Sequence, residues 1–169
     1  MKKILIIILC AICANSLFAQ TLTGSFEALK NMSSLQMEVE FQEIIGMTEE
    51  NFAVYEEDWE KDKHEVLSNF TSSVSKGSKN IIFSTRFNTP YKLRVLVNIM
   101  TKADWFCCAI LIDEQGNEVG RIDNIQCHYA AIGTLLHSIK RVAELTGSKL
   151  GTAINQAVRN KRVKVFGDR

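Results

Sequence analysis

Apolar and polar side chains alternate strictly over residues 35–42 of the chain. The apolar positions are Leu35, Met37, Val39 and Phe41, and the polar ones are Gln36, Glu38, Glu40 and Gln42. Because successive strand residues point to opposite faces of a sheet, this alternation predicts a strand with one buried face. We also expect this strand to expose an edge.

A helical pattern follows. Thr48 is placed to cap a helix, and Glu49 and Glu50 carry negative charge where the helix dipole favours it. Apolar residues then recur at intervals of four or seven, at Tyr55, Trp59, Val66, Phe70 and Val74. The spacing predicts a single amphipathic helix over residues 48–76, with Gly77 as its C-cap.

The middle of the chain predicts four more strands. They are a short strand at 80–85, an alternating strand at 91–101, an apolar strand at 105–112 and a last strand at 118–127. Residues 105–112 are apolar on both faces, which is typical of a central strand covered on both sides. Residues 113–117 predict a hairpin turn in which Gly116 takes a positive φ.

A second helix is predicted over residues 129–158 and is expected to pack on the sheet. One side of it carries Ile132, Leu135, Leu136, Ile139, Val142, Leu150 and Ile154. Gly133, Gly147 and Gly151 each cost about 1 kcal/mol relative to alanine inside a helix, so a compensating feature is expected. We interpret them as close contacts with the sheet or a partner, or as a break near Thr146.

These elements predict an α/β (α+β) fold with the order β-α-β-β-β-β-α. A mixed sheet of about five strands is flanked by the helices at 48–76 and 129–158. Residues 20–169 have the size of one domain with a core of its own.

The first nineteen residues have the pattern of a signal peptide. Lys2 and Lys3 precede an apolar run at 4–13, and Leu17-Phe18-Ala19 forms a cleavage site before Gln20. The alternative is a membrane anchor, but the run is shorter than the roughly 20 residues that span a bilayer. We therefore expect a periplasmic or secreted protein with no transmembrane segment after cleavage.

Charge excludes one class of partner and singles out one segment. The formal net charge is +1, and removing Lys2 and Lys3 leaves −1, so no global basic field attracts nucleic acid. The segment 159–169 is basic: Arg159, Lys161, Arg162, Lys164 and Arg169 stand against Asp168 alone. We interpret it as a solvated terminal tail, with anionic lipid, lipopolysaccharide or nucleic acid as alternative contacts.

Three cysteines, Cys107, Cys108 and Cys127, follow the cleavage site. At least one thiol therefore stays free or pairs between chains. Cys107 and Cys108 are neighbours on a predicted strand and should point to opposite faces. We favour small buried apolar residues, with a disulfide to Cys127 as the alternative. The spacing of these cysteines does not suit zinc, and we expect no metal or cofactor.

No catalytic residue can be assigned from a motif. His64-Glu65 begins like a zinc-protease helix, but Ser68 stands where the second histidine is needed. Two alternatives remain open. One is a hydrolase that uses Cys108 or Cys127 with His128. The other is a small-ligand cleft lined by the aromatic side chains Trp59, Trp105 and Phe106. The leading hypothesis is a non-enzymatic binding or docking domain that binds an envelope protein or a second copy of itself.

Three segments of the chain are similar to segments of known proteins. They are residues 46–52 leading into Asp58-Trp59, the strand pair at 91–112, and the glycine-spaced helix at 146–154. Together they resemble a group of small uncharacterised proteins exported by Bacteroidota. The layout is also similar to periplasmic α/β domains of envelope lipoproteins and secretion accessory proteins, which bind other proteins. Cys10 and Cys13 lack the preceding small residues of a lipoprotein signal, so the resemblance does not imply lipid anchoring.

Overall fold

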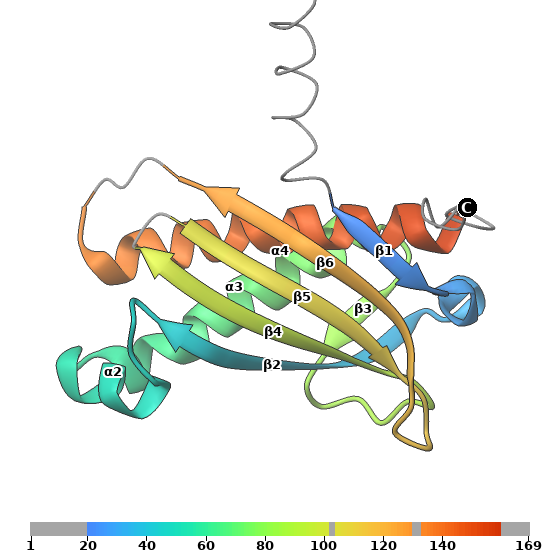
Figure 1. Ribbon diagram of the computed structural model, residues 1–169, viewed down its shortest axis with the longest axis horizontal. Helices are drawn as coiled ribbons and strands as arrows, with labels where there is room; N and C mark the ends of the chain where they lie inside the picture. The colour runs from blue at the N-terminus through green and yellow to red at the C-terminus, as the bar shows by residue number, and fades with distance from the viewer. Residues whose placement is uncertain (1–19, 102–103, 130–132, 160–169) are drawn as a thin grey trace, which may run out of the picture.

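The computed structural model describes residues 20–101, 104–129 and 133–159 (Figure 1). The expected signal peptide at 1–19, Ile132 and the basic residues 160–169 lie outside this part of the chain. In chain order the elements are β1 (Thr21–Gly24), the 3-10 helix η1 (Glu27–Asn31), β2 (Ser34–Ile44), α2 (Glu49–Tyr55), α3 (Trp59–Ser78), β3 (Ile82–Ser84), β4 (Lys92–Thr101), β5 (Asp104–Ile112), β6 (Glu118–His128) and α4 (Leu135–Arg159).

The strands form one mixed sheet in the order β1-β6-β5-β4-β2-β3. β2 runs parallel to both β3 and β4, and the other neighbours pair antiparallel. The predicted α/β class is confirmed, and the sheet has six strands instead of about five. The additional strand is β1, which pairs with residues 120–123 of β6.

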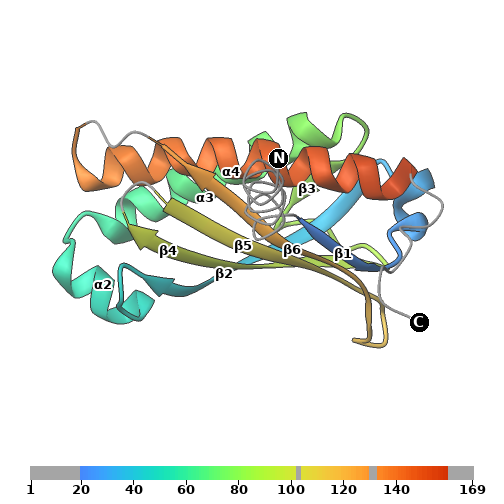
Figure 2. The ribbon, with the colours of Figure 1, turned by 45° about the horizontal axis from the view of Figure 1, so that its top comes forward.

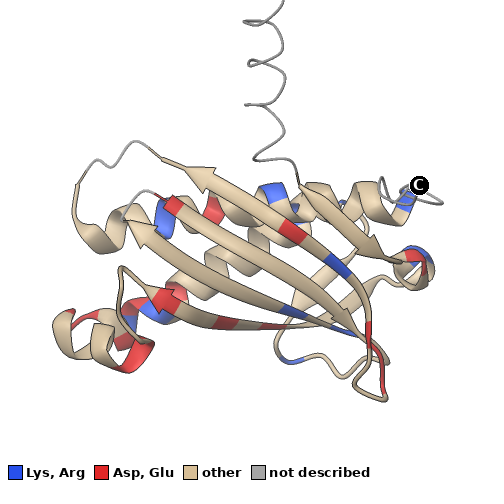
Figure 3. Cartoon of the chain, viewed as in Figure 1, with Lys and Arg blue, Asp and Glu red and all other residues tan. Residues whose placement is uncertain are grey.

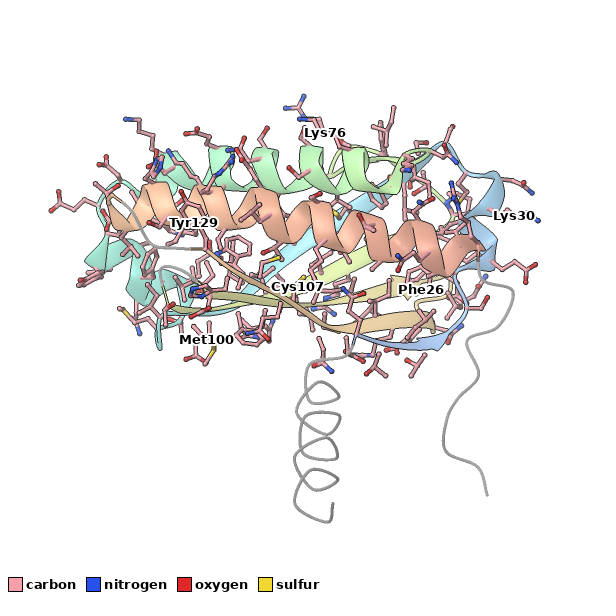
Figure 4. The ribbon with its side chains drawn as sticks, turned by 90° about the horizontal axis from the view of Figure 1, so that it is seen from above. Phe26, Lys30, Lys76, Met100, Cys107 and Tyr129 are labelled. Carbon is pink, nitrogen blue, oxygen red and sulfur yellow. The ribbon has the colours of Figure 1, made fainter. Side chains whose placement is uncertain are left out.

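α3 and α4 lie side by side over one face of the sheet, and no helix of the described residues covers the opposite face, here called the helix-free face (Figures 1 and 2). The expectation that residues 105–112 are covered on both sides is therefore wrong. Trp105 and Cys107 face the helices and are buried, whereas Phe106 and Cys108 face the other way and remain partly exposed. Figure 4 shows Cys107 beneath α4 and Met100 on the helix-free face. No helix in the described ranges is long and apolar enough to span a membrane.

The single helix predicted over 48–76 is divided in two. Thr48 caps α2 as expected, its hydroxyl accepting the Asn51 N–H at 3.3 Å. Glu56 then adopts an extended conformation, and α3 begins at Trp59. The bend places the Trp59 ring edge-on against Phe41 and Phe52, at centroid distances of 5.4 and 5.1 Å. Tyr55 does not belong to the buried stripe, since 67% of it is exposed.

Three glycines lie where the two long helices pack against each other. α4 is continuous from Leu135 to Arg159, so it does not break near Thr146. Cβ atoms built on Gly147 and Gly151 would lie 2.5 and 2.2 Å from carbonyl oxygens of α3. Gly77 is not the C-cap; it lies inside α3, where a Cβ would be 2.5 Å from the Ser148 oxygen. These three glycines therefore lie at the contact between α3 and α4, and not against the sheet.

Candidate functional site

The three cysteines lie on two faces of the sheet. Cys107 and Cys108 point to opposite faces, as predicted from their adjacency. Cys127 stands opposite the buried Trp105, which places it on the same helix-covered face as Cys107. All three thiols are free. Burial is the main cause that raises the pKa of the Cys107 thiol above its ordinary range.

Cys108 lies at an irregularity where β6 departs from regular pairing with β5. Asn124 takes a φ of 59° there, and neither Asp123 nor Asn124 is paired with Cys108 in the register. Arg121 donates from Nη1 to the Cys108 Sγ at 3.1 Å. Burial and then the neighbouring Asp123 carboxylate raise the pKa of the Cys108 thiol to about 12. A thiol in this state is a poor nucleophile at neutral pH.

The structure does not bring Cys108 or Cys127 together with His128. His128 pairs with Asp104 in the register, and its Nδ1 lies 2.6 Å from the Asp104 Oδ1. Cys108 is four residues further along β5, or about 13 Å at the ordinary rise of a strand. Cys127 points to the opposite face from His128. The bond to His128 is the main cause that lowers the pKa of Asp104.

The three aromatic residues predicted to line a ligand cleft do not share one. Trp59 and Trp105 are fully buried on either side of Phe41, with ring centroids 5.4 and 6.0 Å from it. Phe106 lies on the opposite face of the sheet. The Trp105 indole N–H is buried and has no hydrogen-bond partner among the described atoms. Within those same ranges, no group of three or more His, Cys, Asp or Glu side chains could hold a metal ion.

The free edge of β2 is the main candidate for a functional site among the described residues. β3 pairs only with Ser34–Gln36, and no strand in the described ranges pairs beyond it on that side. The Gln36 N–H is directed to Thr89 at the β4 side, so backbone alternation turns the N–H and C=O groups of Met37, Val39 and Phe41 outward. The expected exposed edge at 35–41 is therefore present from Met37 onward, whereas Leu35 pairs with Phe83.

This free stretch, Met37–Phe41, is closed at both ends. β3 stands at its start, and at its far end Ile44 exchanges two backbone hydrogen bonds with Met47, at 2.9 and 3.0 Å. A register shift between Phe41 and Glu43 also bends the strand there. The opening therefore accepts a strand of about five residues.

A groove of ≈ 620 Å³ lies between α3 and β3 on the helix-covered side, next to the start of this edge. α3 runs antiparallel to β2. Its first residue, Trp59, contacts Phe41 near the end of β2. Ser75, near the end of α3, accepts the N–H of Phe83 at 3.0 Å, and Phe83 pairs with Leu35 at the start of β2. The α3 residues of the groove therefore flank the start of the free stretch. The lining is mainly hydroxyl-bearing with an apolar floor: His64, Leu67, Ser68, Thr71, Ser72, Ser75, Ile82, Phe83, Ser84, Thr85 and Arg86.

A second groove, of ≈ 750 Å³, borders β2 on the helix-free side and is charged. Glu38 and Glu40 of β2 form ion pairs with Lys92 and Arg94 of β4, at 2.7 and 2.5 Å. Figure 3 shows the acidic residues along β2 beside basic ones on β4. The hydrogen bond from Arg94 is the main cause that lowers the pKa of Glu40.

An edge with open backbone groups between two grooves can bind an extended peptide as an additional strand. Backbone hydrogen bonds then provide affinity, and the grooves receive alternate side chains. The alternation over residues 35–42 predicted this edge. The two grooves could not be predicted, because they depend on the path of residues 84–91 and on the placement of α3.

Comparison with known proteins gives structural neighbours only. No family model and no curated protein matches the chain. One similar solved structure is the PelC dodecamer from Paraburkholderia phytofirmans. It is 13% identical, with a TM-score of 0.43 over 79% of this chain and 96% of that one. A point variant of the same dodecamer is also 13% identical, with a TM-score of 0.44 over 78% of this chain and 98% of that one.

Proposed function

We propose that this chain is an exported binding module of the cell envelope that docks an extended peptide segment along the free edge of β2. The observation that carries the proposal is the outward-facing backbone of Met37, Val39 and Phe41 between two grooves. Edge strands of this kind bind partners through β-strand addition.

The arrangement of the other polar groups supports a binding role over a catalytic one. The candidate nucleophile Cys108 is bonded to Arg121 and has a raised pKa, and His128 is bonded to Asp104. Neither pair lies at the β2 edge. The edge itself offers hydrogen-bond donors and acceptors, apolar side chains and charge, which are the components of a peptide-binding surface.

Photo-crosslinking in the producing cell tests the proposal. A photoreactive residue at Gln42, which is exposed beside the free stretch, should form a specific crosslink. The same residue at the exposed Gln115, in the β5–β6 hairpin, is the matched control and should not form that crosslink. The crosslinked peptide, identified by mass spectrometry, should come from an extended segment of its protein.

A pair of substitutions separates backbone pairing from side-chain contact. Val39→Pro removes the outward N–H without removing a sheet hydrogen bond, and prolines are tolerated on edge strands. Val39→Ala keeps the N–H and shortens the side chain. Val39→Pro should abolish the Gln42 crosslink, whereas Val39→Ala should retain it. An unchanged crosslink in a folded Val39→Pro protein would contradict docking at this edge.

A further inference from the structure

We infer that the segment docked on the free edge of β2 is residues 160–169 of a second copy of this chain, so that copies assemble head to tail. The inference rests on the proposed function, because it names the occupant of the same edge.

Residues 162–166 alternate in the way that the edge requires. The order Arg162, Val163, Lys164, Val165, Phe166 places the two basic residues and Phe166 on one side of an extended chain and the two valines on the other. The segment is as long as the free stretch, five residues. Valine and phenylalanine also favour extended structure.

The charge of the edge favours such a basic segment and disfavours β2 itself. If two copies paired through β2 in antiparallel register about Val39, Glu38 of each would lie opposite Glu40 of the other. Like charges directly opposite are destabilising in a sheet. A strand with Arg162 and Lys164 on that side would instead bring cations to the same carboxylates, which can accept further hydrogen bonds beyond those from Lys92 and Arg94.

The valine side of the segment fits the other groove. With Arg162 and Lys164 on the helix-free side, Val163 and Val165 point between β2 and α3. The half-buried Leu67 and the methyl-bearing Thr71 of α3 line the groove there. The two valines would therefore cover apolar surface that the isolated copy leaves open.

The position of α4 requires the segment to come from another copy. α4 contacts η1 and the β5–β6 side of the sheet, and α3 lies between α4 and β2 (Figure 1). β6, which α4 contacts, and β2 are three strand spacings apart in the sheet, or about 14 Å. Arg162 is three residues beyond Arg159, and three residues span at most about 11 Å. Donation between copies is a heterologous contact, which forms rings or filaments.

The first experiment measures the mass of the particle that residues 20–169 form in solution, and hence the number of copies in it. Residues 20–169 should form concentration-dependent oligomers in sedimentation velocity, and the double variant Arg162→Glu/Lys164→Glu should be monomeric. The matched control Lys161→Glu/Arg169→Glu makes the same charge change outside the alternating pattern and should assemble as the parent does. Equal assembly of the two double variants would overturn the inference.

A mixing experiment tests the head-to-tail geometry directly. The Arg162→Glu/Lys164→Glu chain keeps its β2 edge and lacks a competent donor segment, whereas Val39→Pro keeps the donor and lacks the edge. Each alone should be monomeric, and an equimolar mixture should form a one-to-one complex. A mixture that stays monomeric although the parent oligomerises would place the self-contact elsewhere.

A synthetic peptide of residues 160–169 completes the test. It should bind the Arg162→Glu/Lys164→Glu chain, and adding Glu38→Gln/Glu40→Gln to that chain should weaken binding by at least about tenfold. If the peptide does not bind while the Gln42 crosslink to an envelope protein persists, this inference is wrong and the proposed function stands. If both are absent, the edge is not a docking site and both are wrong.

Discussion

Gly151 of α4 packs so closely on Val74 of α3 that a Cβ atom built on it would lie 2.2 Å from the Val74 carbonyl oxygen. Real Cβ atoms do not approach a backbone oxygen so closely, so any side chain at this position must separate the two helices. Gly147 repeats the contact one turn earlier, at 2.5 Å from the Phe70 oxygen.

Gly151→Ala should therefore destabilise the domain despite alanine's higher helix propensity. The propensity gain is about 1 kcal/mol, and we expect the cost of overpacking against a rigid backbone, up to about 3 kcal/mol, to exceed it, giving a net loss of up to about 2 kcal/mol. Chemical denaturation followed by circular dichroism measures the loss. Ser148→Ala, an exposed α4 position, is the control and should change stability by less than about 0.5 kcal/mol. A stabilised Gly151→Ala protein would contradict the contact.

Trp59→Ala tests whether that indole belongs to the core or to a ligand site. Trp59 is fully buried between Phe41 and Phe52, so truncation should cost about 3–5 kcal/mol. Phe106→Ala, on the partly exposed face, should cost clearly less. Denaturant midpoints of the two variants provide the comparison. Equal midpoints for Trp59→Ala and the parent chain would show that the indole is not packed as described.

The Cys108 thiol should alkylate slowly in the folded chain. Its pKa is raised to about 12, so at pH 8 the thiolate fraction is roughly a thousandfold below that of an ordinary thiol. Since the pKa is raised, the rate should keep climbing with pH well above 10. Site-resolved mass spectrometry after pulses of iodoacetamide measures it.

Variants at the two neighbours of Cys108 should shift this rate in opposite directions. Asp123→Asn removes a carboxylate that raises the pKa, so alkylation should become faster. Arg121→Gln removes the cation that lowers the pKa, so alkylation should become slower still. The assigned environment would be wrong if Cys108 reacted as fast in the folded parent as in the unfolded chain.

Asp113 should make the β5–β6 hairpin sensitive to acid. Its carboxylate accepts the backbone N–H groups of Asn117 and Gln115, at 2.8 and 3.0 Å, and the bond from Asn117 is the main cause that lowers its pKa. A carboxyl whose pKa is lower in the folded state stabilises that state above its unfolded pKa of about 3.9. This stability is lost as the pH falls through the lower folded value.

Thermal unfolding at two pH values measures this contribution. Asp113→Asn should lower the melting temperature at pH 6, and its difference from the parent chain should shrink as the pH falls through the lowered pKa of Asp113 in the folded state. Glu114→Gln, an exposed neighbour in the same turn, should leave the melting temperature unchanged at both values. A pH-independent difference for Asp113→Asn would assign its effect to turn geometry alone.

Local patterns predicted the elements well where one face is buried and one is solvated. Two such elements are confirmed by the structure. One is the strand that buries Met37 and Phe41, and the other is the helix that buries Val66 and Phe70. The bend before Trp59 was missed because Tyr55 satisfies the same four-residue spacing as the buried positions. β1 was missed because four residues carry too little periodicity.

Long-range relationships could not be predicted from such patterns. The parallel pairing of β2 with β4 brings Val39 beside Val95, more than fifty residues away, and no local signal specifies it. The glycine spacing indicated a close contact, but only the packing of the helices shows that α3 is the neighbour. The edge of the candidate site was predicted from one strand, whereas its grooves arise from three separate segments.

The pairing of β1 with β6 also constrains when the molecule can fold. Thr21 pairs with Asp123, so the partner of the first strand is synthesised about one hundred residues later. At a synthesis rate of about 5–20 residues per second, that interval is about 5–20 s. Throughout it, β1 has no native partner. The sheet can be completed only after β6 has emerged, so premature folding of the chain's first half leaves this outer strand undocked.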